Sequence, residues 1–418
     1  QWNFGIDTGM YPLGSCTMKY NPKINEKMAA TAGLASAHPL LEADLAQGIL
    51  ELHYELEQFL SAITGMDAVS LQPSAGAQGE LTAMLMFAAY FRKKGEQRTK
   101  ILIPDTAHGT NPASAALCGF TAIPLASGKH GILDPTAVEE LMDDETVGIM
   151  VTNPNTLGLF EEHIREITDI VHSRGGLVYG DGANMNAIMG MVDIKRCGID
   201  AVHLNLHKTF STPHGGGGPG SGPVCVTAEL APYLPVPRVA KTDEGYVLET
   251  QSAESIGRVH GFFGNVSVLI RAYSYILSMG PENLKKASQL AVLNGAYVKA
   301  RLLDTFDLAY DRPCMHECVF SDARQLPFKV TTLDMAKRLI DHGYHPPTIY
   351  FPLVVSGAIM IEPTETECKD DLDSFIEVFQ EIAQEAENDG ERLRQAPVIT
   401  KVRRLDETQA ARKPCLRG

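Results

Sequence analysis

Short apolar runs alternate with helical segments along most of this chain, and this alternation constrains the fold more than any other feature. The spacing of apolar residues predicts an amphipathic helix over residues 42–63, a second helix ending near Lys93 and a third over 161–174. Short apolar runs predict strands at 101–103, 147–152, 177–179, 201–206 and 224–227. Such an order is typical of a parallel sheet covered by helices, with ligands beyond the carboxyl ends of the strands. We therefore expect an α/β fold.

The 418 residues can form one large domain and a smaller one. Beyond about Ser278 glycine becomes less frequent, and helices are expected near residues 282–304, 332–342 and 371–389. We predict an N-terminal segment, a large domain and a smaller C-terminal α/β domain, over residues 1–41, 42–280 and 281–418.

Charge and cysteine content exclude several classes of partner. With 51 acidic and 36 basic residues the formal charge is −15, which disfavours nucleic acid and anionic membranes as partners, so an anionic ligand must be held by local donors. The longest strongly apolar run, residues 81–91, is too short to span a bilayer. The eight cysteines form no C-x-x-C pair, which favours a reducing compartment. The cluster over 314–318 lacks a second paired cluster, so we expect no metal.

Lys208 lies between an apolar run and the glycine-rich stretch 215–222. A lysine amine in such a place can condense with the aldehyde of pyridoxal phosphate (PLP). The nearby glycines let backbone N–H groups approach a ligand. The alternative is a surface lysine beside a linker.

Two further motifs fit the same cofactor. The turn of Ser74, Ala75, Gly76, Ala77 and Gln78 precedes a helix, whose N-terminus can bind a phosphate, although the turn could also be an ordinary helix cap. Asp181 follows an apolar strand, where its carboxylate can pair with a pyridinium nitrogen. Aspartate is also a common turn residue.

Two loops between these motifs carry further polar candidates. His108, after the strand at 101–103, could lie flat on a cofactor ring, shuttle protons or make an ordinary polar contact. Asn153 and Thr156 follow another strand, where they could donate to a phenolate oxygen or close a turn. The order of these motifs along the chain favours a cofactor site.

Four strings of residues resemble glycine dehydrogenase (decarboxylating), the P-protein of the glycine cleavage system. The likeness is to the PLP-bearing subunit of its two-subunit form, or to the C-terminal half of its single-chain form. It extends from residue 4 to at least residue 360. The strings that carry it are residues 12–19 (PLGSCTMK), 72–80 (QPSAGAQGE), 105–112 (DTAHGTNP) and 203–222.

This resemblance implies a PLP-dependent transferase fold (fold type I) with a mainly parallel seven-stranded sheet. It implies decarboxylation of glycine with PLP and transfer of the aminomethyl group to a lipoyl arm. Lys208 would be the Schiff-base lysine, Asp181 the partner of the pyridinium nitrogen and His108 the stacking residue. The turn over 74–78 would be the phosphate site. Other expected cofactor contacts are Asn153, Thr156, Ala183 and His207.

The resemblance also implies partners: a companion subunit 1, a lipoylated H-protein, and a heterotetramer of two plus two chains. The expected location is the cytoplasm, or the mitochondrial matrix for a eukaryotic single-chain form. An ordinary PLP aminotransferase or amino-acid decarboxylase would share Lys208 and Asp181, but it should use an arginine for a substrate carboxylate, and none lies in the motifs. A scaffold subunit is a further alternative, but it would not need Lys208. Lys19 is expected to be exposed, although it could meet a substrate carboxylate.

Overall fold

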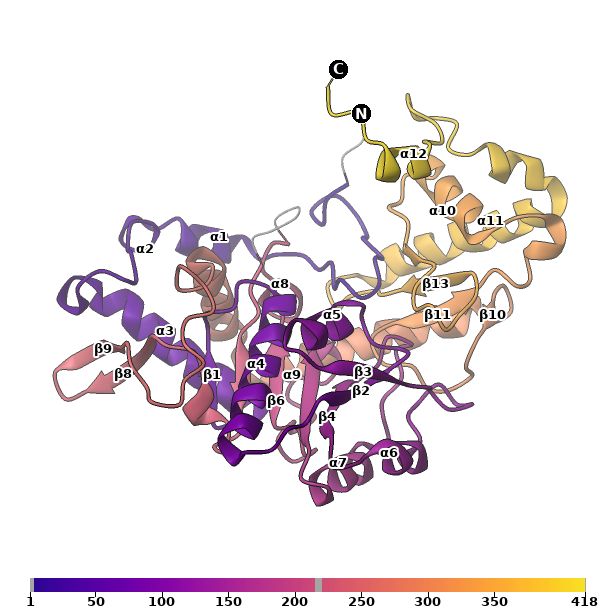
Figure 1. Ribbon diagram of the computed structural model, residues 1–418. Coiled ribbons are helices and arrows are strands. Elements are labelled where there is room, and N and C mark those ends of the chain that lie inside the picture. Colours follow the sequence, from indigo (N-terminus) through magenta and orange to yellow (C-terminus); the bar gives the residue numbers. More distant parts are fainter. Residues whose placement is uncertain (1–3, 215–219, 418) are drawn as a thin grey trace.

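The computed structural model describes residues 4–214 and 220–417 (Figure 1). The larger part is built on seven strands: β1 (Ala68–Ser70), β2 (Lys100–Pro104), β3 (Thr121–Leu125), β4 (Thr146–Thr152), β5 (Leu177–Gly182), β6 (Ala201–Leu204) and β7 (Val224–Val226). They form one sheet in the order β1-β7-β6-β5-β4-β2-β3. Neighbours from β3 to β6 run parallel, whereas β7 is antiparallel to both β1 and β6. The expected mainly parallel seven-stranded sheet is confirmed.

Helices bury both faces of this sheet. They include α3 (Ala43–Thr64), α4 (Gly76–Lys94), α5 (Thr110–Leu117), α6 (Pro135–Leu141) and α7 (Ile164–Ser173). Because side chains alternate along a strand, Ile101 and Ile103 pack with Phe87 of α4 on one face. Leu102 packs with Leu56 of α3 on the other face. This double cover explains why the central strands are continuously apolar.

The long helix α9 (Val266–Leu302) connects the two parts of the molecule and is interrupted at Gly280. Gly280 has φ 66°, a backbone conformation that favours glycine, and Pro281 follows it without an N–H to continue the hydrogen bonding. The kink coincides with the domain boundary expected at residue 280. The division into 1–41, 42–280 and 281–418 stays a prediction.

The smaller part is an antiparallel sheet packed with helices (Figure 1). The strand order is β10-β11-β13-β12, and the core between sheet and helices is built on aromatic residues such as Phe306, Phe375 and Phe379. Its elements are β10 (Asp307–Leu308), β11 (Cys318–Ser321), β12 (Thr348–Ile349), β13 (Ala358–Ile361), α10 (Thr332–Asp341) and α11 (Lys369–Gln395).

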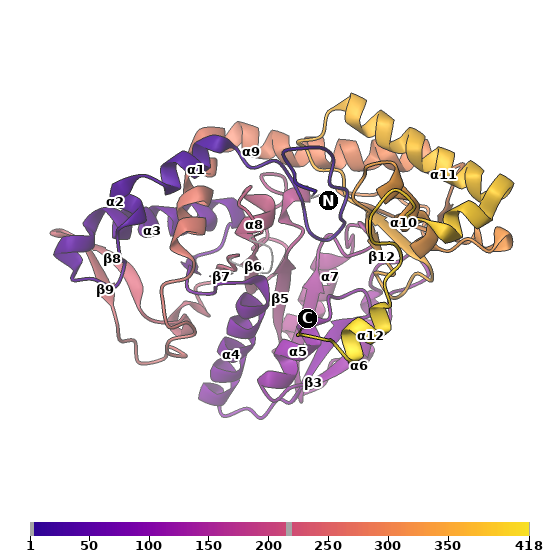
Figure 2. The same cartoon turned by 90° about the horizontal axis from the view of Figure 1, so that it is seen from above.

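The N-terminal segment lies against both parts. Its helices are α1 (Lys23–Ala29) and α2 (Ala32–Ala35), and Glu26 of α1 forms an ion pair with Arg271 of α9 at 2.8 Å. The loop before α1 pairs Leu13 with Ile361 of β13. Figure 2 shows this loop between the large sheet and the smaller part. The N-terminal segment thereby connects the small sheet to the strand ends of the large one.

The remaining elements are short. They include α8 (Leu206–Thr209), the hairpin β8 (Arg238–Thr242) and β9 (Gly245–Glu249), and α12 (Glu407–Arg412). The strand expected over 201–206 ends at Leu204, because the neighbouring strand begins after Pro223, which has no N–H to extend the ladder. Lys208 therefore lies in α8. Within the described residues, no helix is both long and apolar enough to cross a membrane.

Candidate active site

Strand register places three polar side chains in one row at the carboxyl ends of the parallel strands. Thr152 of β4 pairs with Asp181 of β5, and Asp181 pairs with His203 of β6. Residues in register on parallel strands point to the same face, so the three side chains lie next to one another. All three line one cavity, which has an empty volume of about 880 Å³ and opens to solvent.

Most of the expected site residues meet in this cavity. Gly76, Ala77, His108, Thr156, Asp181, Ala183, His207 and Lys208 line it, although they come from separate loops and elements. Ser74, Ala75, Gln78 and Asn153 are not among its lining residues. The part of the glycine-rich stretch over 215–219 lies outside the described residues.

Asp181 is buried and held by uncharged donors. Its carboxylate accepts hydrogen bonds from the Ala183 N–H at 3.0 Å and from Asn111 Nδ2 at 3.3 Å. Within the described residues, the only basic side chain that makes an ion-pair contact with it is His203, at 3.6 Å. Burial lowers the pKa of His203, so this ring is neutral. The Asp181 charge therefore stays available to a ligand in the cavity.

His203 is oriented by neighbours on both of its nitrogens. Its Nδ1 lies 2.5 Å from the Tyr179 hydroxyl, and burial raises the pKa of Tyr179, so that hydroxyl keeps its proton and donates. Its Nε2 lies 2.8 Å from Asn205 Oδ1 and faces the Asp181 carboxylate. Two oxygen acceptors at Nε2 place the ring proton there. His203 therefore donates toward Asp181.

The expected phosphate turn is divided between two functions. The Ser74 N–H and hydroxyl both donate to Gln78 Oε1, at 2.8 and 2.9 Å, so these two side chains close the turn. Gly76 and Ala77 begin α4 and face the cavity. A Cβ on Gly76 would lie 2.5 Å from Asn205 Nδ2, so glycine is required for this approach.

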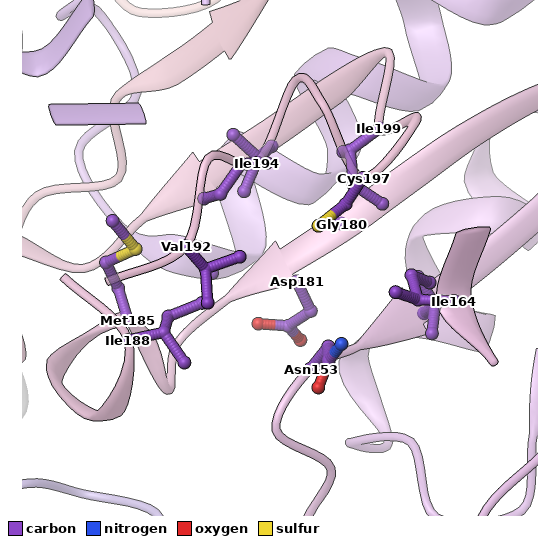
Figure 3. A pocket seen from close by; sticks show the side chains of 13 residues that line it. Asn153, Ile164, Gly180, Asp181, Met185, Ile188, Val192, Ile194, Cys197 and Ile199 are labelled. Carbon is purple, nitrogen blue, oxygen red and sulfur yellow. The ribbon is translucent and has the colours of Figure 1, made fainter. Parts of the chain in front are cut away.

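The loop after β4 separates Thr156 from Asn153. Thr156 lines the cavity and donates its hydroxyl proton to the Thr106 carbonyl at 2.5 Å. Asn153 accepts from the Glu161 N–H at 3.0 Å and lines a second, mainly apolar cavity, which Asp181 also lines (Figure 3). The structure therefore does not bring the Asn153 side chain to the wall that Lys208 lines.

The His207 ring contacts two segments of the chain. Its Nε2 lies 3.2 Å from Asn205 Nδ2, and the Ser221 N–H donates to its Nδ1 at 3.2 Å. Burial, assisted by His214 and Lys208, lowers the pKa of His207 to about 3. The ring is therefore neutral, and it packs edge-on against His214 at 5.1 Å between ring centroids.

The N-terminal loop adds Ser15 and Cys16 to the cavity. The Ser15 N–H donates to Glu317 at 2.9 Å and the Thr17 hydroxyl donates to Glu362 at 2.5 Å, so buried carboxylates of the small part hold this loop. Ser15 and Thr17 both have positive φ, at 62° and 47°, a strained conformation for residues with a Cβ.

The expectation of an exposed Lys19 is wrong. Its side chain is 2% exposed, and its ammonium group contacts Glu365 at 2.7 Å and the Thr209 carbonyl at 2.6 Å. The ion pair with Glu365 compensates the cost of burying the charge. Lys19 therefore connects the N-terminal loop to the small part and to α8.

Sequence reasoning missed several cavity residues and one neighbouring cluster. His203 and Asn205 alternate with His207 in the chain, which is a usable signal for a shared face, whereas nothing local marks the others. The cluster, His316 with Glu317 and Glu362, is buried in the small part. The missed cavity residues are Ser15, Cys16, Glu80, Thr110, Thr152, Asn184, His203, Asn205 and His214.

The residues of the cavity fit PLP. α4 begins without a side-chain cap, so its first N–H groups can bind a phosphate. Within the described residues, the buried atoms Thr152 Oγ1 and His214 Nε2 have no hydrogen-bond partner, as expected of groups that a ligand satisfies. An amine for the cofactor aldehyde and a carboxylate for its ring nitrogen are present in Lys208 and Asp181.

Comparison with known proteins gives matches over the whole chain. The family model "Glycine dehydrogenase, C-terminal domain" matches residues 287–401, and "Aminotransferase class-V" matches residues 76–218. The probable glycine dehydrogenase (decarboxylating) subunit 2 of Caldanaerobacter subterraneus is 56% identical, over 100% of this chain and 86% of that protein. The protein of the same name from Bacillus thuringiensis is 55% identical, over 99% and 85%.

Solved structures show the same fold at low sequence identity. An inhibitor-bound glycine decarboxylase (P-protein) of the glycine cleavage system has a TM-score of 0.77 and 18% identity, covering 90% of this chain and 86% of that one. A C-DES mutant with glycine covalently linked to the PLP cofactor has a TM-score of 0.68 and 14% identity, covering 90% and 97%.

Proposed function

The chain belongs to the glycine dehydrogenase (decarboxylating) subunit 2 family, and on that premise we propose that it removes CO₂ from glycine and passes the aminomethyl group to the lipoyl arm of an H-protein. It is an enzyme of the glycine dehydrogenase type that uses PLP, and it has a companion subunit. The observation that carries the proposal is the meeting of Lys208 and Asp181 in one cavity at the strand ends.

The chain's own residues divide the work of holding the cofactor. PLP, when bound, supplies a protonated ring that accepts the electron pair released as CO₂ leaves. Lys208 supplies the amine for covalent attachment, and the N–H groups of Gly76 and Ala77 bind the phosphate. His108, exposed at the cavity, supplies a flat ring for stacking.

Asp181 holds a proton on the cofactor ring nitrogen. The neutral His203, the Asn111 amide and the Ala183 N–H orient its carboxylate without cancelling its charge. A buried carboxylate with a full charge stabilises a protonated partner more strongly than a solvated one, because the local dielectric constant is low. His203 is therefore a positioning residue for Asp181.

Assembly and location are further parts of the proposal. The name of the related subunits supports a companion chain, from which we infer a heterotetramer of two plus two chains. The open side of the cavity suits entry of a lipoyl arm. We also propose a cytoplasmic location, since the eight cysteines are free thiols, as in a reducing compartment.

A spectral titration tests the proposal. The chain with PLP and its companion subunit is expected to show a visible absorption band that shifts on addition of glycine and stays unchanged with alanine or glutamate. An aminotransferase would respond to the larger amino acids instead. Lys208→Ala is expected to abolish both the band and a borohydride-reducible adduct, because no other lysine lines the cavity within the described residues. A reducible adduct in that variant would contradict the role of Lys208.

A further inference from the structure

Glu80 is a buried carboxyl group in the cavity, and none of the roles above uses it. It lies on α4 one turn after Gly76 and is 3% exposed. Its Oε1 is 2.8 Å from the Thr110 hydroxyl, and its Oε2 is 3.4 Å from the Ser114 hydroxyl. Both partners belong to α5, so Glu80 connects the two helices at the cavity wall.

Thr110 continues this connection to His108. The Thr110 hydroxyl lies 2.8 Å from His108 Nδ1, and the Thr110 N–H donates to the same nitrogen at 3.3 Å. A backbone N–H can only donate, so His108 Nδ1 carries a lone pair and the ring proton is on Nε2. The Thr110 hydroxyl then also donates to Nδ1. Because a hydroxyl has one proton, its hydrogen bond to Glu80 requires a proton from Glu80.

The surroundings of Glu80 favour its neutral form. Burial and the nearby Asp181 carboxylate raise the pKa of Glu80 to about 7, while the hydrogen bonds with Thr110 and Ser114 and the charge of Lys208 oppose the shift. The other titratable groups facing it are His203 and Tyr179, both of which are uncharged. Two adjacent buried carboxyl groups do not both ionise easily, so Glu80 is mainly neutral below about pH 7.

We propose that Glu80 is a positioning residue that sets the tautomer and orientation of His108: as a neutral acid it donates to Thr110, and Thr110 donates to His108 Nδ1. When Glu80 releases its proton to solvent, the Thr110 hydroxyl turns to the carboxylate and His108 loses this donor. The role of His108 toward the cofactor rests on the proposed function. The hydrogen-bond relay from Glu80 through Thr110 to His108 depends only on contacts within this chain.

Nitrogen NMR of histidine-labelled protein without PLP tests the relay directly. Recorded between about pH 6 and about pH 9, His108 is expected to show an unprotonated, hydrogen-bonded Nδ1 whose signal moves with a midpoint near the pKa of Glu80. His108→Gln assigns the signals. Glu80→Gln, whose amide N–H donates to Thr110 as the acid does, should remove the movement. Thr110→Ser should preserve it, and Thr110→Val should give the high-pH signal throughout.

Ser114→Ala is the matched control, since it removes the other contact of Glu80 and leaves the relay intact. A protonated His108 Nδ1, an unchanged pH response in Glu80→Gln, or loss of the response in Ser114→Ala would each overturn the proposal. Wild-type PLP affinity should fall severalfold above the midpoint, and that of Glu80→Gln should stay constant. If the NMR response is found but glycine shifts no visible band, the relay stands and the proposed function is wrong.

Discussion

Asp181 is the residue whose charge the site is built to preserve. Asp181→Asn keeps the shape of the side chain and removes the charge that we propose holds a proton on the cofactor ring. Loss of a buried charged partner costs about 3–5 kcal/mol, so we expect decarboxylation to fall by roughly two to four orders of magnitude while PLP still binds through Lys208. The measurement is release of labelled CO₂ from glycine together with the visible spectrum.

Asp169→Asn is the matched control for this change. Asp169 is exposed on α7 and pairs with Arg165 at 3.0 Å, away from the cavity lining. A surface pair of this kind contributes little, so the control should decarboxylate as the wild type does. A near wild-type rate of decarboxylation in Asp181→Asn would show that Asp181 has only a structural role in a turn.

Single residues show where sequence reasoning reaches its limit. Lys208 and Asp181 could be predicted because each lies at the end of an apolar run, and the structure brings both to one cavity. The burial of Lys19 could not be predicted, because its ion-pair partner Glu365 lies 346 positions later. Asn153 has the right local context, but its side chain turns to Glu161. Long-range partners decide these outcomes, and no local pattern contains them.

At the scale of elements, the start of α4 depends on close packing at Gly79. A Cβ there would lie 2.7 Å from the Gly222 carbonyl oxygen and 2.7 Å from His203 Cβ, and neither atom can move freely. Gly79→Ala is therefore expected to cost about 1–3 kcal/mol and to weaken PLP binding, since it displaces the helix N-terminus that we propose holds the phosphate. Thermal unfolding and PLP affinity measure the two effects.

Gly48→Ala provides the matched control on α3. Nothing lies within 4 Å of the added Cβ, so this substitution is expected to stabilise the helix by about 0.5–1 kcal/mol. Wild-type stability and PLP affinity in Gly79→Ala would show that the close approach is not required.

Helix α3 also buries Glu57, which makes stability depend on pH. Burial raises the pKa of Glu57 from 4.5 to about 8, so the folded state binds this proton more tightly than the unfolded state. The resulting stability is fully present below pH 4.5 and is lost as the pH rises through about 8, at up to ~1.4 kcal/mol per pH unit. Between about pH 6 and about pH 9, the apparent Tm of Glu57→Gln should therefore fall less than that of the wild type. Glu139→Gln, at an exposed position, should follow the wild type.

Elements with a strong period were predictable and short or edge elements were not. Helices α3, α4 and α7 begin and end within a few residues of the expected positions, because their apolar residues recur at helical spacing. Strand β3 was missed because it is a partly exposed edge strand containing Pro124. β10 and β12 have two residues each, too few to show alternation. The first half of α9 was missed because the Gly280 kink obscures its continuity.

At the scale of the whole molecule, the site is assembled from parts that lie far apart in the chain. Glu317 and Glu362 of the small part hold the loop that carries Cys16 into a cavity built on the large sheet. Burial and the neighbouring Glu362 raise the pKa of Glu317, which favours the neutral form of the carboxyl that accepts the Ser15 N–H. The position of the small part and the geometry of the site are therefore coupled through this loop.

That coupling leads us to expect that the companion subunit contributes to activity. Large apolar side chains are exposed on α1, at the start of α3 and on the loop before α3: Leu45 is 72% exposed, and Ile24 and Leu41 are 46% exposed. Such exposure is expected of a surface that an obligate partner covers. These residues precede or begin α3, and α1 packs on α9, so a partner there would fix the segment that leads to the cavity.

We expect the isolated chain to bind PLP weakly and to show little glycine–bicarbonate exchange with lipoylated H-protein alone. Adding the companion subunit should restore exchange, measured as labelled bicarbonate entering glycine. Full exchange without the companion would show that this chain assembles its site alone, and that the exposed apolar surface serves another purpose.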